Sequence, residues 1–122
     1  MTTLVTGATG FAGINIVLAL VEAGERVVAL DTVGASLECR RYITDHNDKI
    51  EFVIGDVSDA DATLKIVKET DVKRIVHAAA ITPPRDVELS MPSHVINVNL
   101  MGTVNMLDIA LTISAKRFVF VS

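Results

Sequence analysis

The chain has 122 residues, of which 50% are hydrophobic and 21% charged, and its formal net charge is −4. This composition argues against a disordered chain, and the scattered lysines and arginines argue against a nucleic-acid partner. Because Cys39 is the single cysteine and Met1–Gly10 lacks the features of a targeting signal, we expect a soluble, cytoplasmic protein with no disulfide and no membrane partner.

Strands and helices alternate through the first half of the sequence. Thr3–Thr6 is a short predicted strand, and a glycine-rich turn connects it to a predicted helix over Phe11–Ala23. That helix has apolar side chains spaced along one face, at Ile14, Val17, Leu18 and Val21. The apolar run in Arg26–Leu30 predicts a strand buried on both faces, and a short helix is predicted around Leu37–Ile43.

The second half continues the alternation, with predicted helices over Asp59–Thr70 and Met91–Ser114. Ser58 is the predicted N-cap of the first of these helices. The prolines Pro83 and Pro84 mark Ile81–Leu89 as a loop. Three more strands are predicted, at Ile50–Ile54, Arg74–His77 and Lys116–Ser122.

This order of elements predicts an α/β fold. Strands that alternate with helices form βαβ units and a parallel sheet, and the crossovers between parallel strands are right-handed. We therefore expect a three-layer αβα domain over residues 1–122, with strand order 3-2-1-4-5 and no internal repeat or linker.

The glycine-rich turn is the strongest indication of function. Gly7, Gly10 and Gly13 follow a strand and open a helix, which is the setting of a phosphate-binding turn. Glycine lets the backbone N–H groups approach a diphosphate, and the helix N-terminus offers unpaired donors and partial positive charge. We assign Thr9 and Phe11, which lie within the turn, to the same site.

The segment Thr6–Gly13, T-G-A-T-G-F-A-G, resembles the T-G-x-x-G-x-x-G fingerprint of extended short-chain dehydrogenases/reductases. These are NAD-dependent epimerases, dehydratases and reductases that act on nucleotide sugars and related alcohols. The resemblance implies a Rossmann fold that binds NAD or NADP. It covers essentially the whole chain, but only the N-terminal part of a typical member.

Asp31 bears on the choice between these cofactors. A carboxylate at the end of the second strand can accept hydrogen bonds from the adenosine ribose, and it repels a 2′-phosphate, which favours NAD. The same side chain could instead cap the following loop. Arg40 and Arg41 could hold a 2′-phosphate, so NADP stays open.

The resemblance extends to three later segments. It implies that Asp56 bonds the adenine amine and Val57 packs on the ring, although Asp56 could simply be a turn residue. Small residues where the cofactor crosses the strand ends are expected at Ala78, Ala79 and Ala80. Asn99, in a stretch similar to the family's N-x-x-G-T-x-N-x-L, would face the cofactor near its nicotinamide end.

The remaining polar residues near these segments have simpler interpretations. His77 is expected to be packed at the strand end rather than catalytic, and Asn105 to hold an adjoining loop. Gly102, inside a helix, predicts a close packing partner. Because His46 and His94 are not spaced with other ligands, no metal site is predicted.

The long predicted helix is apolar on two sides. One stripe contains Val95, Val98, Met106, Ile109 and Ile113, and the nearly opposite stripe contains Leu100, Val104, Leu107 and Leu111. The sheet would cover one stripe. The other would be covered by a second subunit, giving a homodimer, or by a neighbouring helix of a longer protein.

The sequence stops where the family's chemistry begins. Ser122 resembles the first residue of a serine run, whereas the family's Y-x-x-x-K motif is missing, since Tyr42 is followed four residues later by His46. We expect the chain to bind dinucleotide without catalysing, as a fragment of an enzyme or as a short natural protein. The alternatives are a non-catalytic NAD(P)-binding sensor or scaffold, and a different dehydrogenase family with this fold.

Overall fold

Five parallel strands form a single sheet in the computed structural model, which describes the backbone of residues 1–122 and every side chain except those at positions 44, 45 and 47. The strand order is β3-β2-β1-β4-β5, as predicted. The strands are β1 (Thr2–Thr6), β2 (Arg26–Asp31), β3 (Ile50–Ile54), β4 (Val72–His77) and β5 (Arg117–Phe120).

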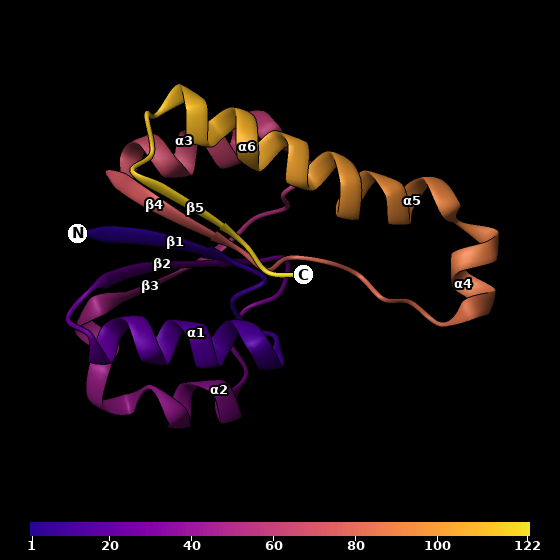
Figure 1. Cartoon of the computed structure of the whole chain (residues 1–122). Helices are drawn as coiled ribbons and strands as arrows, with labels where there is room; N and C mark the ends of the chain where they lie inside the picture. The colour runs from indigo at the N-terminus through magenta and orange to yellow at the C-terminus, as the bar shows by residue number, and fades with distance from the viewer.

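Helices cover both faces of the sheet (Figure 1). One face carries α1 (Phe11–Glu22) and α2 (Leu37–Tyr42), which a 3-10 segment, Thr44–Lys49, connects to β3. The other face carries α3 (Ala60–Glu69) and α6 (Gly102–Thr112). This arrangement confirms the predicted three-layer αβα architecture.

The covered sheet has a separate apolar core on each face, because successive side chains of a strand point to opposite sides. Leu4 and Val5 are neighbours in β1, yet Leu4 belongs to the core beneath α3 and α6 and Val5 to the core beneath α1. Val28 and Ala29 divide in the same way in β2. Burial on both faces explains why these strands read as continuous apolar runs.

The long helix predicted over Met91–Ser114 has three parts in the structure. It begins as α5 (Pro92–Ile96), widens into a π-helical turn, η2 (Asn97–Met101), and ends as α6. By length and composition alone, Pro92–Thr112 is also apolar enough to cross a membrane, with a mean hydropathy of 1.3, and 22% of that window is buried. A helix that covers the sheet of a soluble protein meets the same criterion.

Two local predictions were wrong. The segment predicted as a loop contains a short helix, α4 (Arg85–Ser90), which lies far from the sheet in Figure 1 and has Asp86 and Glu88 in its first turn. Acidic residues stabilise a helix N-terminus, and the two prolines precede that helix instead of interrupting it. The N-cap of α3 is Asp59, not Ser58, because the Asp59 carboxylate accepts a hydrogen bond from the Ala62 N–H.

Candidate functional site

The turn between β1 and α1 is packed so closely that two of its positions require glycine. Gly7 has a φ of +67°, and a Cβ there would lie 2.8 Å from the Ala79 nitrogen and 2.9 Å from the Ala78 carbonyl. A Cβ on Gly13 would lie 1.9 Å from the Gly7 oxygen. Gly7 therefore lets the turn approach the end of β4, and Gly13 lets α1 approach the turn.

The N-terminus of α1 is open to an anion. Its N-cap is Gly10, no side chain caps it, and its first turn has no acidic residue. The first N–H groups of a helix have no partner within the helix, and the aligned peptide dipoles add partial positive charge there. This end of α1 consequently offers hydrogen-bond donors and a favourable potential to a phosphate group.

The turn opens onto a cavity of about 840 Å³ at the carboxyl ends of the strands, where ligands bind in open α/β sheets. Its volume lies in the usual range for small-molecule sites. The cavity collects segments that are far apart in the sequence. Of the residues predicted for the site, those that line it are Gly7, Thr9, Gly10, Phe11, Gly13, Asp31, Asp56, Val57, Ala78, Ala79 and Ala80.

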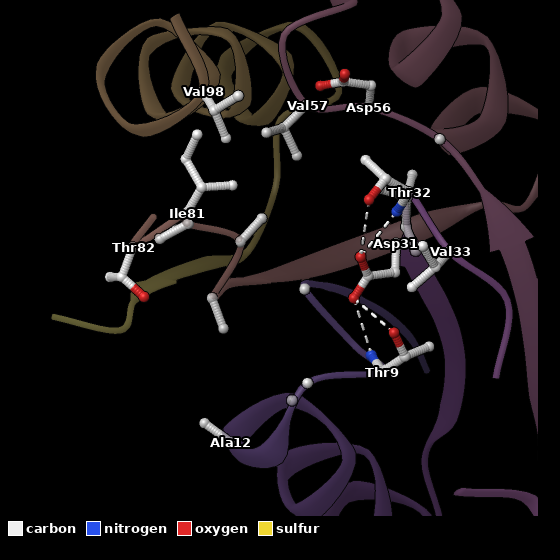
Figure 2. A pocket seen from close by; sticks show the side chains of 18 of the residues that line it. Thr9, Ala12, Asp31, Thr32, Val33, Asp56, Val57, Ile81, Thr82 and Val98 are labelled. Atoms are coloured by element: carbon white, nitrogen blue, oxygen red, sulfur yellow. Dashed lines mark hydrogen bonds between the residues drawn. The ribbon is translucent and has the colours of Figure 1, made fainter. Parts of the chain in front are cut away.

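Asp31 connects the end of β2 to the turn. Its Oδ2 atom accepts hydrogen bonds from the Thr9 backbone N–H at 3.1 Å and the Thr9 hydroxyl at 2.9 Å, as Figure 2 shows. Its Oδ1 atom accepts from the Thr32 N–H at 2.8 Å. The carboxylate therefore caps the following loop, which is one of the two interpretations of Asp31, and it also lines the cavity. Its contact with a ribose stays a prediction.

The long helix fixes the segment Asp56–Ser58. A Cβ on Gly102 would lie 2.6 Å from a methyl group of Val57, so Val57 is the close packing partner that this glycine predicted. The Asn105 side chain donates hydrogen bonds to the carbonyls of Val57 at 3.0 Å and Ser58 at 3.4 Å, which confirms that Asn105 holds an adjoining loop.

Asp56 is oriented from within its own turn. Its Oδ1 atom accepts hydrogen bonds from the Ser58 N–H at 2.9 Å and from the Ser58 hydroxyl at 2.7 Å. This turn fixes the Asp56 carboxylate, which lines the cavity near Val57 in Figure 2. Ser58, which was predicted to cap α3, therefore orients the Asp56 carboxylate instead.

Asn99 is the one predicted site residue that is not part of the cavity lining. Its Oδ1 atom accepts from the Ile81 N–H, and its Nδ2 group donates to the Ile81 carbonyl, both at 2.8 Å. Asn99 thereby fixes Ile81, which does line the cavity. A contact between Asn99 and a cofactor stays a prediction.

His77, the last residue of β4, is fully buried behind the cavity. Its ring lies 2.7 Å from the Thr6 hydroxyl through Nδ1 and 3.0 Å from the Thr103 hydroxyl through Nε2. Phe118 and Phe120 of β5 lie beside it, with ring centroids 6.3 and 6.0 Å away. Burial lowers the pKa of His77 from its ordinary value of 6.5, because an imidazolium loses its hydration there.

Some residues of the cavity were not predicted. Thr32, Val33, Ile81 and Thr82 continue segments that were predicted, and the strand ends gave the signal for them. His94 and Val98 come from α5 and η2, and no spacing in the sequence connects them to the turn. Ala12, Leu30 and Gly55 also line the cavity and were not predicted.

The basic residues considered for a 2′-phosphate have other contacts. Arg40 lies over the Phe52 ring at 5.9 Å and donates to the Ala35 carbonyl, and neither Arg40 nor Arg41 lines the cavity. Across the side chains that the structure describes, no three His, Cys, Asp or Glu residues are grouped as metal ligands.

Comparisons with known proteins place this geometry in context. A model of the family described as GDP-mannose 4,6 dehydratase matches residues 4–122. The UDP-glucose 4-epimerase of Mycolicibacterium smegmatis is 36% identical over 123 residues, covering 100% of this chain. The chain spans 38% of that protein's length.

Solved structures share the fold. The UDP-glucose 4-epimerase of Thermus thermophilus, a complex with NAD, matches 98% of this chain with a TM-score of 0.81 and 27% identity. The dTDP-glucose 4,6-dehydratase of Bacillus anthracis, also a complex with NAD, matches 100% of it with a TM-score of 0.80 and 28% identity. The chain covers 37% of each of these two structures.

Proposed function

The chain belongs to the GDP-mannose 4,6-dehydratase family of NAD-dependent epimerases and dehydratases, and from this premise we propose that it is the NAD-binding part of a nucleotide-sugar epimerase or dehydratase. One observation carries the proposal. Gly7, Gly10 and Gly13 open the uncapped N-terminus of α1 onto the 840 Å³ cavity, beside the carboxylate of Asp31. A dinucleotide needs these two features together, an anion site for its diphosphate and an acceptor for its ribose hydroxyls.

The residues around the turn fit the remainder of the cofactor. Asp56 would accept a hydrogen bond from the adenine amine, and Val57, with Val98 beside it in Figure 2, offers an apolar surface to the ring. Ala78–Ala80 leave room for the cofactor to cross the end of β4. We propose that Phe11, whose side chain is 91% exposed at the cavity wall, is covered when the cofactor binds.

The proposed division of labour is that this part of the protein binds and orients the cofactor, which supplies hydride transfer at its nicotinamide ring. Tyr42 is exposed on α2 and does not line the cavity, so it is not placed to transfer a proton to a bound substrate. Ser122 follows β5 at the carboxyl edge of the sheet. We therefore expect cofactor binding without turnover from these 122 residues.

Calorimetry with NAD and with NADP tests the proposal and the role of Asp31. We expect NAD to bind more tightly than NADP, because the Asp31 carboxylate accepts from ribose hydroxyls and repels a 2′-phosphate. The variant Asp31→Asn should weaken NAD binding about tenfold, which corresponds to the loss of about one charged hydrogen bond. It should also reduce the preference of the chain for NAD over NADP.

Asp61→Asn is the matched control, since it removes the same charge from an exposed position on α3. It should leave both affinities unchanged. Failure of the unaltered chain to bind either dinucleotide would refute the function itself. Equal losses for the two cofactors in Asp31→Asn would refute only the ribose assignment.

We also propose that the chain self-associates through the long helix. The stripe predicted to face a second subunit is exposed, with 58% of Leu100, 45% of Leu107 and 79% of Leu111 accessible. The opposite stripe is buried against the sheet at Val98, Met106 and Ile109. Exposed apolar surface of this extent on one helix favours an interface with a second copy.

A further inference from the structure

The hydrogen-bond partners of His77 determine which nitrogen of its ring carries the proton. Three elements meet at this residue, because the imidazole lies between Thr6 at the end of β1 and Thr103 in α6, beside the aromatic side chains of β5. Each hydroxyl has other partners whose roles are fixed by their chemistry. The partners of the Thr6 hydroxyl and those of the Thr103 hydroxyl therefore each determine where the proton of the imidazole lies.

At the Thr6 end, the hydroxyl oxygen accepts from two backbone groups. The N–H groups of Ala78 and Ala79 each donate to Oγ1 at 3.2 Å, and the Ala78 N–H also reaches the Thr6 carbonyl. A hydroxyl has two lone pairs and one hydrogen, and backbone N–H groups can only donate. The third partner, Nδ1 of His77 at 2.7 Å, must then receive the Thr6 hydrogen, so Nδ1 is unprotonated.

At the other end, Thr103 gives the same answer independently. Its hydroxyl donates to the Asn99 carbonyl at 2.9 Å, since a carbonyl oxygen can only accept. The Thr103 oxygen is therefore free to accept from His77, and Nε2, 3.0 Å away, must carry the hydrogen. Both ends require a neutral imidazole protonated on Nε2.

The direction of these bonds matters for the cavity. Ala78 and Ala79 line it, and their backbone also faces Gly7, where a Cβ would lie within 2.9 Å of them. The Thr6 hydroxyl holds both N–H groups only while its own hydrogen points away from them, toward His77. The orientation of one hydroxyl thus supports the wall of the cavity and the contact between that wall and the turn.

We propose that His77, as the Nε2–H tautomer, is a positioning residue for the cofactor. His77 orients the Thr6 hydroxyl, and this hydroxyl in turn holds Ala78 and Ala79 against Gly7. This inference rests on the proposed function, because it concerns the cavity that we assign to NAD. His77 touches neither cofactor nor substrate in this role. It acts through Thr6, and its bond to Thr103 fixes the ring.

Two substitutions separate positioning from simple packing. His77→Asn places an amide oxygen where Nδ1 accepts from Thr6, and it loses the contact with Thr103. His77→Gln extends an amide toward Thr103, and it leaves the Thr6 hydroxyl without its acceptor. Both variants replace a buried ring with a smaller amide, so both are expected to lower the free energy of unfolding. Denaturant titration measures that loss for each variant.

The proposal predicts that the two variants, His77→Gln and His77→Asn, differ in their affinity for NAD. His77→Gln should raise the Kd for NAD about five- to tenfold, the effect of a lost neutral hydrogen bond, whereas His77→Asn should change it less than about twofold. Equal effects of the two variants on the Kd would overturn the proposal. If either fails to fold, Thr6→Ser and Thr6→Val make the same comparison, since serine keeps the hydroxyl and valine removes it.

Nitrogen-15 NMR of the 122-residue chain provides a readout that packing alone does not affect. The imidazole of His77 should show a protonated Nε2 and an unprotonated Nδ1 at neutral pH. Protonation on Nδ1 would contradict the inference even if NAD binds. A chain that shows the expected tautomer but binds no NAD would leave the tautomer standing and refute the proposed function instead.

Discussion

His77 is a buried residue whose protonation opposes folding. Burial lowers its pKa below the ordinary 6.5, while Thr6, Thr103, Phe118 and Phe120, the side chains described around it, present no titratable group. The unfolded chain therefore takes up a proton near pH 6.5, and the folded chain takes it up only at lower pH. Stability due to this residue is complete above that range and declines as the pH falls through it.

We accordingly predict that the free energy of unfolding decreases between pH 7.5 and pH 5, a decrease to which His77 contributes. Chemical denaturation across this range measures it, with His77→Gln as the comparison, because that variant cannot titrate at position 77. The variant should show a shallower decline than the unaltered chain. Parallel declines would show that His77 does not contribute to the pH dependence.

At the site, the sequence allowed some residues to be predicted and not others. The turn glycines and Asp31 could be predicted, because each occupies a fixed place relative to a strand or helix end. Asn99 was placed by resemblance, and the structure shows its amide bonded at both ends to Ile81. A side chain with two donors and an acceptor takes whichever partners the fold brings near, and the sequence does not contain that information.

At the scale of elements, the contact between α1 and the turn depends on Gly13. A Cβ there would meet the Gly7 carbonyl oxygen at 1.9 Å, so α1 would have to move away from the turn. We expect Gly13→Ala to lower stability by about 2 kcal/mol or more, because overpacking outweighs the gain in helix propensity of about 1 kcal/mol. Thermal or denaturant unfolding measures the change.

Gly34→Ala is the control for this substitution. A Cβ at Gly34 would lie 3.8 Å from its nearest neighbour, the Cδ1 atom of Ile54, and its φ is not in the left-handed region. Its stability should stay within about 0.5 kcal/mol of the unaltered chain. A Gly13→Ala variant as stable as this control would show that α1 can shift without cost.

The elements themselves were largely predictable, and the exceptions have physical causes. Apolar periodicity located the strands and the long helix, since burial on a sheet imposes it. It did not reveal the π-helical turn Asn97–Met101, where one extra residue changes the phase of the helix between α5 and α6. The short α4 was missed because its six residues follow two prolines and contain only two apolar side chains, Val87 and Leu89, too few to show a helical period.

For the whole molecule, the exposed stripe on α6 leads to a prediction about assembly. We expect concentration-dependent dimerisation in sedimentation velocity, and the double variant Leu107→Lys/Leu111→Lys should be monomeric, because two charges would be buried at the interface. Leu89→Lys, at a leucine that is 70% exposed on α4, should dimerise like the unaltered chain. A monomer at all concentrations would show that the stripe serves another contact.

The sequence by itself determined the class of fold, the strand order and the position of the glycine-rich turn. Each of these depends on local order: which residues alternate, where glycines stand relative to a strand, and how parallel strands must be connected. Together with the family resemblance, which supplied Asp56, Val57 and the three alanines after β4, these signals predicted eleven residues that line one cavity.

Only the tertiary structure decided how the cavity is held together. The bonds from Asn99 to Ile81, from Asn105 to Val57 and from His77 to Thr6 and Thr103 join residues that lie 18 to 71 positions apart. Polar side chains of this kind form whichever hydrogen bonds the packed fold brings within reach, because a buried donor or acceptor is costly to leave unpaired. Such partners become definite only when the sheet and its helices are assembled.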